Sequence, residues 1–283
     1  MNLSLDVPTP LAYFASLVQS DADFPLLEAA VSLAQDDYPD LDMQQVLGDV
    51  DQLLARLKRR LPADAGPLQK LRVVNQFFFR DLKFSCNVND YYDPDNSYLS
   101  VILLTRRAIP VTLAVLWLEL AQGLGLAVRG VGFPGHFMLK VNLPEGQVVI
   151  DPLDGQSLSR EELAERLGPA RLRSSLLDDF EIPLALYLKA STPREIIARM
   201  LRNLKEIHTT QEDWPRLIAV LDRLVVLLPN AWTEYRDRGL AHAEADQAGL
   251  AVKDLECYLV NAEAGLDRAA IVARVTELKR MMR

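Results

Sequence analysis

The feature that most constrains this chain is a change of hydrophobic periodicity that occurs twice along its length. Over the first 82 residues, apolar side chains recur at i, i+3, i+4 and i+7, which is the spacing of amphipathic helices. Three short segments with the apolar pattern of β-strands then follow between residues 127 and 153. From about residue 191 the helical spacing returns. The pattern therefore predicts a helical region, a small sheet and a second helical region.

The order of these segments predicts the fold class. A segment rich in Asn, Asp, Tyr and Ser, FSCNVNDYYDPDNSYLS, follows the first helices and is predicted to be an irregular loop. In the next helix, Pro110 suits the first turn, because its missing N–H group would have no partner there. A helix followed by an antiparallel meander indicates an α+β core. We expect an α+β domain over 1–190, with a helical part at 1–82 and a core at 83–190, and an all-α domain over 191–283.

The C-terminal helical region is weakly self-similar. The segment LIAVLDRLVVLLP matches GLAVKDLECYLVN in kind, with Asp222 over Asp254 at an offset of 32. The RNL triplet at 202–204 lies over RGL at 238–240 at an offset of 36. A final amphipathic segment, DRAAIVARVTELKRMM, is able to cap the last open face. Helix pairs of about this period resemble tetratricopeptide repeats, and a generic helical hairpin is the alternative.

Charge and composition bear on the partners and the compartment. A net charge of −8 gives no overall attraction to nucleic acid or anionic membranes, even with Arg106, Arg107 and the basic triplet at 58–60. The longest apolar stretch is interrupted by Glu119 and falls short of the ~20 residues that a bilayer requires. The N-terminus has no signal-peptide pattern, and two distant cysteines suit a reducing cytosol. We expect a cytoplasmic protein without nucleic-acid or membrane partners. The sequence indicates no oligomeric state.

A candidate site follows from two neighbouring strands. The stretch FPGHFMLKV places His136 at the head of one strand, and Asp151 ends the next. The two residues thus offer the His and the Asp of a Cys-His-Asp arrangement. In papain-like and transglutaminase-like enzymes the thiol stands at the start of a helix, where the helix dipole and the His lower its pKa. The corresponding helix start, RRAIPVTLA, contains no cysteine.

At these residues the chain resembles the bacterial SirB-type family, most strongly over 91–159. That family joins a transglutaminase-like domain to C-terminal tetratricopeptide-type repeats. Matching the LGL motif to the Leu-Gly pair that ends the enzymes' helix places the missing Cys at Pro110 and its preceding Gly at Ala108. The resemblance implies that His136 and Asp151 are the remaining members of the triad. The family usually has Arg-Arg-Gly-Ile-Pro here. Ala108 is therefore a small departure from the family's sequence, whereas Pro110 agrees with it.

The residues themselves leave alternatives for the nucleophile. Cys86 is the other thiol of the first domain, in a loop that can fold toward the site, and it is the candidate for a displaced nucleophile. Thr112 lies about 200° around the helix from Pro110 and lacks the special base that threonine nucleophiles use. His136 and Asp151 also have structural interpretations. The imidazole can cap a strand, and the carboxylate can accept backbone N–H groups in a turn.

The loop before the helix offers polar groups near the site. Tyr91, Tyr92, Asn96 and Ser97 lie in YYDPDNSYL. They either build a structural loop or form a rim that contacts a peptide.

Together these features predict a non-catalytic protein-binding or scaffold protein with a degenerate transglutaminase-like fold. A protein or peptide partner suits both halves, because such a cleft takes an extended strand and helical repeats take a helix or tail. The alternative is a cysteine hydrolase or acyltransferase that uses Cys86. No cofactor is expected. A metal is not expected either, because His208 and His242 lack the spacing of metal ligands.

Overall fold

The structure is a computed structural model that describes residues 8–168, 183–263 and 265–282. The chain divides into two compact units. The core unit comprises Pro25–Ala34 and Asp40–Met200, and the repeat unit comprises Met1–Phe24, Gln35–Pro39 and Leu201–Arg283. A domain boundary near residue 190 stays a prediction, since these units are not separated by a single point in the sequence.

The N-terminal helix groups with the C-terminal helices for a physical reason. Helix α1 (Pro10–Leu17) contacts α11 (Trp214–Leu227) within the repeat unit. Its Phe14 is fully buried, and the guanidinium of Arg223 lies 5.8 Å from the centre of the Phe14 ring. Arg223 also forms an ion pair with Asp36. Such contacts join segments about 200 residues apart, so no local sequence pattern predicts them.

The helices of the core unit follow the predicted periodicity. Helix α3 (Met43–Lys58) begins after Asp42, whose carboxylate accepts a hydrogen bond from the backbone N–H of Gln45 at 3.0 Å. Its apolar stripe is buried at Val46, Val50, Leu53 and Leu57. The other helices are α2 (Leu26–Ser32), α4 (Pro67–Asn75) with π-helical turns at Gln76–Asp81, α5 (Leu99–Thr105), α6 (Pro110–Gly123), α7 (Arg160–Arg166), α9 (Leu184–Tyr187) and the first part of α10 (Pro193–Thr210).

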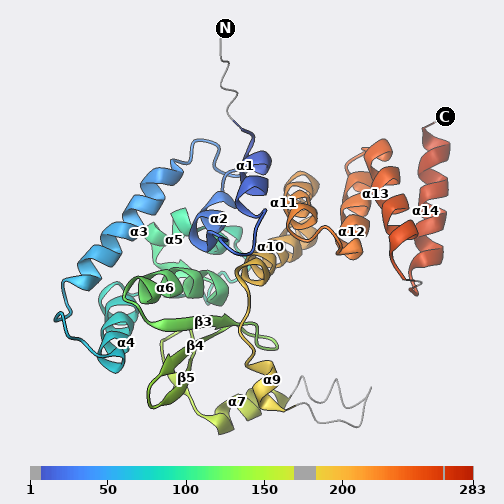
Figure 1. The fold of residues 1–283 in the computed structure, drawn as a ribbon. Coiled ribbons are helices and arrows are strands. Elements are labelled where there is room, and N and C mark those ends of the chain that lie inside the picture. The colour runs from blue at the N-terminus through green and yellow to red at the C-terminus, as the bar shows by residue number, and fades with distance from the viewer. Residues whose placement is uncertain (1–7, 169–182, 264, 283) are drawn as a thin grey trace. The chain divides into compact units, whose positions relative to one another are not determined.

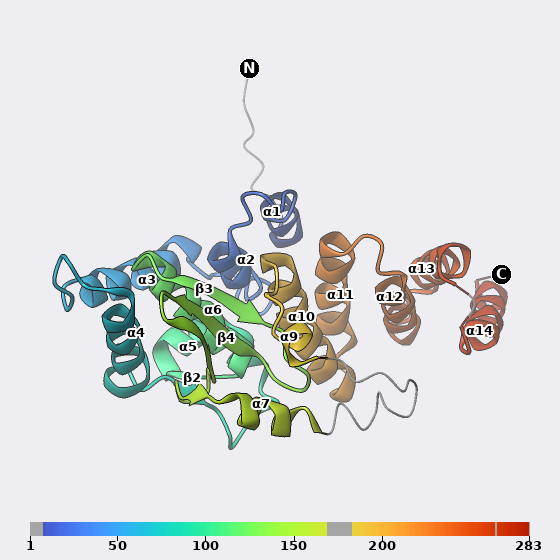
Figure 2. The same ribbon diagram turned by 60° about the horizontal axis from the view of Figure 1, so that its bottom comes forward.

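A four-stranded antiparallel sheet forms the β part of the core unit, in the order β3-β4-β5-β6. The strands are β3 (Ala127–Val131), β4 (Met138–Leu143), β5 (Gly146–Ile150) and β6 (Ser157–Leu158). Helix α6 lies against β3 and β4 (Figures 1 and 2). It is apolar on all sides and almost wholly buried, which makes it the central helix of this core. The predicted α+β core is confirmed.

A short parallel strand pair lies beside the start of α6. Strand β1 (Ser85–Cys86) pairs with β2 (Arg107–Ala108), and Cys86 lies opposite Ala108. The segment predicted to be an irregular loop thus contains a strand and, at Pro94–Ser97, a 3-10 helix. Both are too short to produce a hydrophobic period, so the prediction missed them.

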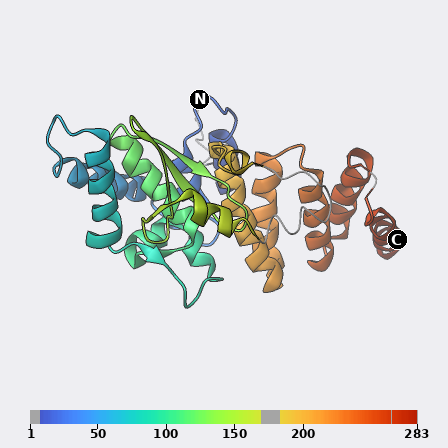
Figure 3. The ribbon, with the colours of Figure 1, turned by 90° about the horizontal axis from the view of Figure 1, so that it is seen from below.

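The repeat unit continues from α10 with four antiparallel helices, which follow one another in a row (Figure 3, orange to red). They are α11, α12 (Trp232–Glu244), α13 (Ala248–Asn261) and α14 (Arg268–Met281). Arg238 on α12 donates two hydrogen bonds to Asp254 at 2.6 and 2.8 Å and one to Asp222 at 2.8 Å. The two aspartates that the sequence repeat aligned therefore bind the same guanidinium. No helix in the described part of the chain is long and apolar enough to span a bilayer.

Candidate functional site

The structure brings His136 and Asp151 together at one end of the sheet, before the start of β4 and after the end of β5. The backbone N–H of His136 donates to the carbonyl oxygen of Phe133 at 3.0 Å, which closes a four-residue turn between β3 and β4. Pro134 occupies the second position of this turn, and Gly135 the third with φ +69°. This pairing suits a type II turn, in which the third residue needs positive φ. The turn places the His136 side chain so that Nε2 lies 3.1 Å from Oδ1 of Asp151.

Asp151 is a buried carboxylate with three donors. Oδ1 faces His136 and also accepts the backbone N–H of Leu153 at 3.0 Å, while Oδ2 accepts from Nη1 of Arg166 at 2.7 Å. Burial opposes ionisation, but the hydrogen bonds from His136, Leu153 and Arg166 outweigh it and lower the pKa of Asp151 to about 2. The carboxylate is therefore ionised at neutral pH. An ionised Asp151 fixes the imidazole with Nε2–H as the donor.

The helix start contains no group that can act as a nucleophile. Pro110 is the first residue of α6 and is buried, as is Ala108 before it. Thr112 is fully buried, and its hydroxyl has no hydrogen-bond partner within the described residues. Because the Thr112 side chain is fully buried, its hydroxyl oxygen cannot reach a substrate. The site thus keeps an oriented imidazole, while the first side chain of α6 has no proton to give.

Cys86 lies closer to this position than its place in a loop suggested. Its strand partner, Ala108, precedes Pro110 by two residues, and the backbone N–H of Asn87 donates to the carbonyl oxygen of Ala108 at 3.1 Å. Burial and the negative charge of Asp151 raise the pKa of the half-buried Cys86 thiol. A raised pKa keeps the sulfur protonated at neutral pH, whereas a catalytic cysteine has a lowered pKa.

The four predicted rim residues separate into two pairs. Asn96 is buried, and its side-chain amide donates to the backbone carbonyl oxygen of Asp90 at 2.6 Å. The backbone carbonyl oxygen of Asn96 accepts the backbone N–H of Ile109 at 3.3 Å. Ser97 is also fully buried. These two side chains are covered by the loop itself, so they do not offer a contact surface to a partner. The rings of Tyr91 and Tyr92 are exposed and lie edge to face, with 5.5 Å between their centres.

Two side chains that the sequence interpretation missed support the site. Arg166 reaches Asp151 from α7, a helix that begins with a capping box between Ser159 and Glu162. The Ser-x-x-Glu spacing was the available signal for that helix. The other is Asn75, whose carbonyl oxygen accepts from Nε1 of Trp117 at 2.9 Å and whose amide donates to the carbonyl of Gly155 at 3.2 Å. No sequence signal pointed to Asn75.

Two of the basic residues considered for nucleic acid, Arg106 and Arg60, are engaged within the core unit. The guanidinium of Arg106 lies 4.7 Å from the centre of the Phe84 ring. Arg60 forms an ion pair with Asp81, and its guanidinium lies 4.6 Å from the centre of the Phe77 ring.

Comparisons with known proteins match both parts of the chain. A family model described as the transglutaminase-like superfamily matches residues 44–202, and a tetratricopeptide-repeat model matches residues 204–276. A UPF0162 protein of Xylella fastidiosa is 36% identical over 240 residues, which cover 84% of each chain. A UPF0162 protein of Pseudomonas aeruginosa is 26% identical over 89% of this chain and 90% of its own length. The UPF0162 protein YchA of Escherichia coli is 25% identical over 86% of this chain and 90% of its own length.

No solved structure matches the chain. The matches confirm the resemblance noted from the sequence, because they give a transglutaminase-like domain, C-terminal repeats and bacterial relatives. They also favour tetratricopeptide repeats over a generic helical hairpin. The chain belongs to the transglutaminase-like superfamily, within the UPF0162 proteins, and carries tetratricopeptide repeats after that domain.

Proposed function

We propose that this protein is a non-catalytic protein-binding member of the transglutaminase-like superfamily. The observation that carries the proposal is the buried proline at the start of α6, Pro110, at the position to which the resemblance assigns the missing nucleophile. Proline has no nucleophilic atom and no proton to transfer. The His136–Asp151 pair in this proposal is a structural relic that holds the β3–β4 turn against the end of β5.

Two surfaces support a protein partner. The tetratricopeptide repeats are a module that commonly mediates protein interactions. In the core unit, Tyr91 and Tyr92 expose aromatic rings, a residue type that is enriched at interfaces. In this proposal the two rings form the rim of the binding surface.

Cysteine hydrolase or acyltransferase activity through Cys86 is the second candidate, and one observation favours it. The thiol lies opposite Ala108, near the helix start, and close enough to Asp151 for that charge to act on its pKa. The direction of the pKa shift argues against the activity, because burial and, to a smaller extent, Asp151 both disfavour the thiolate. We therefore prefer the non-catalytic function.

Alkylation of single-cysteine variants separates the two candidates. The chain has two cysteines, and both are half-buried, so Cys257 is a matched internal control. With iodoacetamide at neutral pH, we expect Cys86 in the Cys257→Ser variant to react no faster than Cys257 in the Cys86→Ser variant. Selective labelling of Cys86 that is lost in His136→Ala would establish an activated thiol and contradict the proposal.

A further inference from the structure

Three arginines of the core unit lie against two buried aromatic rings. The guanidinium carbons of Arg56, on α3, and Arg60, just after this helix, lie 5.7 and 4.6 Å from the centre of the Phe77 ring. The guanidinium carbon of Arg106, which follows α5, lies 4.7 Å from the centre of the Phe84 ring. Both rings are buried. A planar guanidinium that stacks on a ring keeps its N–H groups at its edge, where they can still donate hydrogen bonds.

The positive charge of this group is only partly compensated within the core unit. Arg60 forms an ion pair with Asp81. Among the residues that the structure describes, Arg56 and Arg106 have no carboxylate partner, and Nη1 of Arg106 is buried without a hydrogen-bond acceptor. Burial and the neighbouring charge of Arg56 lower the pKa of Arg106 from its ordinary value. Arg106 still carries its charge at neutral pH, because that value lies above 12.

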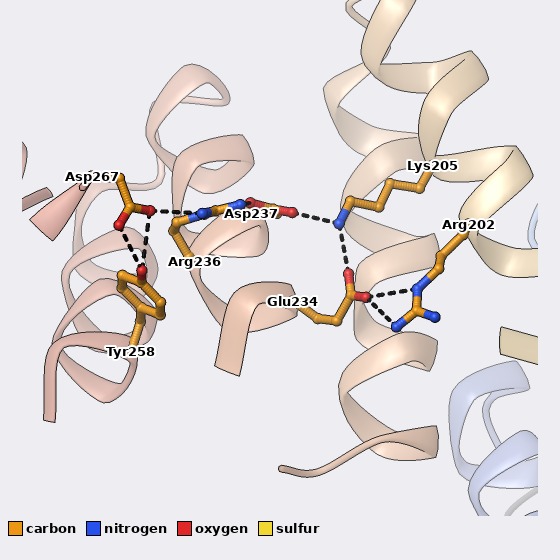
Figure 4. Close-up of polar contacts among 7 residues, drawn as sticks. All are labelled: Arg202, Lys205, Glu234, Arg236, Asp237, Tyr258 and Asp267. Carbon is orange, nitrogen blue, oxygen red and sulfur yellow. Dashed lines mark hydrogen bonds and ion pairs between the residues drawn. The ribbon is translucent and has the colours of Figure 1, made fainter. Parts of the chain in front are cut away.

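An arginine of the repeat unit shows the usual arrangement. Arg236 is half-buried, as Arg106 is, but it donates to Asp237 at 2.8 Å and to Asp267 at 2.6 Å (Figure 4). These carboxylates compensate the loss of hydration that burial imposes on a charged group. Arg106 has undergone a similar loss without a counter-charge from the described residues. An anion that binds beside Arg106 would supply the interaction that Arg236 obtains within the chain.

We propose that Arg56 and Arg106 bind a phosphate monoester group on the surface of the core unit. Such a group carries a charge of about −1.5 to −2 at pH 7, which matches two uncompensated guanidinium groups. Its oxygens also accept paired hydrogen bonds from the planar edge of an arginine. A phosphodiester carries one negative charge and would leave one of the two cations uncompensated. This site is separate from the repeats, so the inference goes beyond the proposed protein-binding function and does not depend on it.

The phosphate group can belong to a phosphorylated side chain of a partner protein or to a small phosphorylated molecule, and the test distinguishes these sources. The full chain is titrated at neutral pH and one low ionic strength with four probes. These are a short acetylated and amidated peptide with a central phosphoserine, the same peptide with serine, inorganic phosphate, and dimethyl phosphate as the diester. Titration calorimetry gives the affinities. The Nε–H signal of Arg106 in NMR, assigned by its absence from Arg106→Gln, reports the place of binding.

We expect a phosphate-bearing probe to bind and to shift the Arg106 signal, and the serine peptide and the diester to bind about tenfold more weakly or less. A phosphopeptide that binds about tenfold tighter than inorganic phosphate would identify a modified protein as the source. Equal affinities would identify a small phosphorylated molecule.

Two variants and a control test the assigned residues. Arg106→Gln and Arg56→Gln should each weaken binding by about tenfold. Arg56 is exposed on α3, so its replacement keeps the test valid even if Arg106→Gln fails to fold. The matched control is Lys58→Gln, which removes the same charge from an exposed position of α3 about 200° around the helix from Arg56. It should leave the affinity unchanged. Thermal unfolding checks that the variants are folded.

Four results would overturn the inference. The first is absence of binding by both phosphate-bearing probes at about 10 mM. The second is binding that leaves the Arg106 signal unchanged. The third is an equal loss of affinity in Arg56→Gln and Lys58→Gln, which would show a general effect of surface charge. The fourth is binding of dimethyl phosphate as tight as that of inorganic phosphate.

Discussion

Cys86 lies opposite Ala108 in the parallel β1–β2 pair, two residues before the proline that starts α6. The chain therefore carries a thiol near the start of α6, where the resemblance implies the missing nucleophile, although not on the helix itself. Burial, and to a smaller extent the ionised Asp151, raise the pKa of Cys86 and disfavour its thiolate. The geometry brings a thiol close to the start of α6, and the raised pKa of that thiol supports the proposed non-catalytic function.

Asp151 should stabilise the fold in a pH-dependent way. Its folded pKa of about 2 lies below its ordinary value of 3.8, so its contribution is present above pH 3.8 and is lost as the pH falls toward 2. Asp151→Asn should lower the free energy of unfolding by about 2 kcal/mol at pH 7. Urea unfolding measures this effect. The difference in the free energy of unfolding between Asp151→Asn and the wild type should decrease as the pH falls from 6 to 3.

The control for this experiment is Asp154→Asn, at an exposed residue of the same turn. It should change the free energy of unfolding by less than about 0.5 kcal/mol. A difference between Asp151→Asn and the wild type that stays constant across the pH range would show that the carboxylate charge is not the stabilising feature.

The two side-chain donors to Asp151 should differ in their effect on its pKa. The hydrogen bond from His136 lowers the pKa of Asp151 more than the bond from Arg166, a side chain that is 42% exposed. His136→Ala should therefore raise the pKa of Asp151 more than Arg166→Ala does. Carbon-13 NMR of the Asp151 carboxyl carbon during a pH titration measures both. The reverse order would make Arg166 the principal partner of the carboxylate.

Restoring the thiol should restore reactivity if only the nucleophile has been lost. Pro110→Cys, in a chain without Cys86 and Cys257, places sulfur in the first turn of a long helix, where the dipole favours a thiolate. The loss of proline should cost about 1 kcal/mol or less. We expect iodoacetamide labelling below pH 7 that weakens in His136→Ala.

Arg107→Cys in the same background is the matched control, because Arg107 is exposed in β2 just before this helix. Its thiol should titrate as an ordinary cysteine near ~8.5. If the thiol at position 110 titrates in the same way, the helix start and His136 no longer converge.

Packing of the repeat helices should depend on one glycine. A Cβ atom at Gly239 would lie 2.8 Å from Cγ of Leu255 and 3.1 Å from its backbone nitrogen, so Gly239→Ala forces α12 and α13 apart. We expect a loss of about 1–3 kcal/mol in calorimetric unfolding. Gly48→Ala on α3 has nothing within 4 Å and should instead stabilise by about 0.5–1 kcal/mol. A stabilising effect of both variants would contradict the close approach of α12 to α13.

Local sequence patterns predicted the contacts that form between neighbouring elements of the chain. The proline and glycine before His136 predict a turn, and strand adjacency brings Asp151 to it, so this contact was predictable from the sequence. Arg166 reaches Asp151 only because α7 packs back against the sheet near the end of β5, and no hydrophobic periodicity predicts that packing. The burial of Asn96 likewise depends on a 3-10 turn folding onto the start of α6.

The pH dependence of alkylation at Cys86 tests the central claim most directly. In the Cys257→Ser variant, the rate of reaction with iodoacetamide from pH 6 to pH 10.5 gives the pKa of the Cys86 thiol. We predict a midpoint above the ordinary value of about 8.5. In the same background, Asp151→Asn should move the midpoint downward, because the carboxylate charge that opposes the thiolate is gone. A midpoint below pH 7 that rises in Asp151→Asn would contradict the account, because Cys86 would then be an activated nucleophile supported by the His136–Asp151 pair.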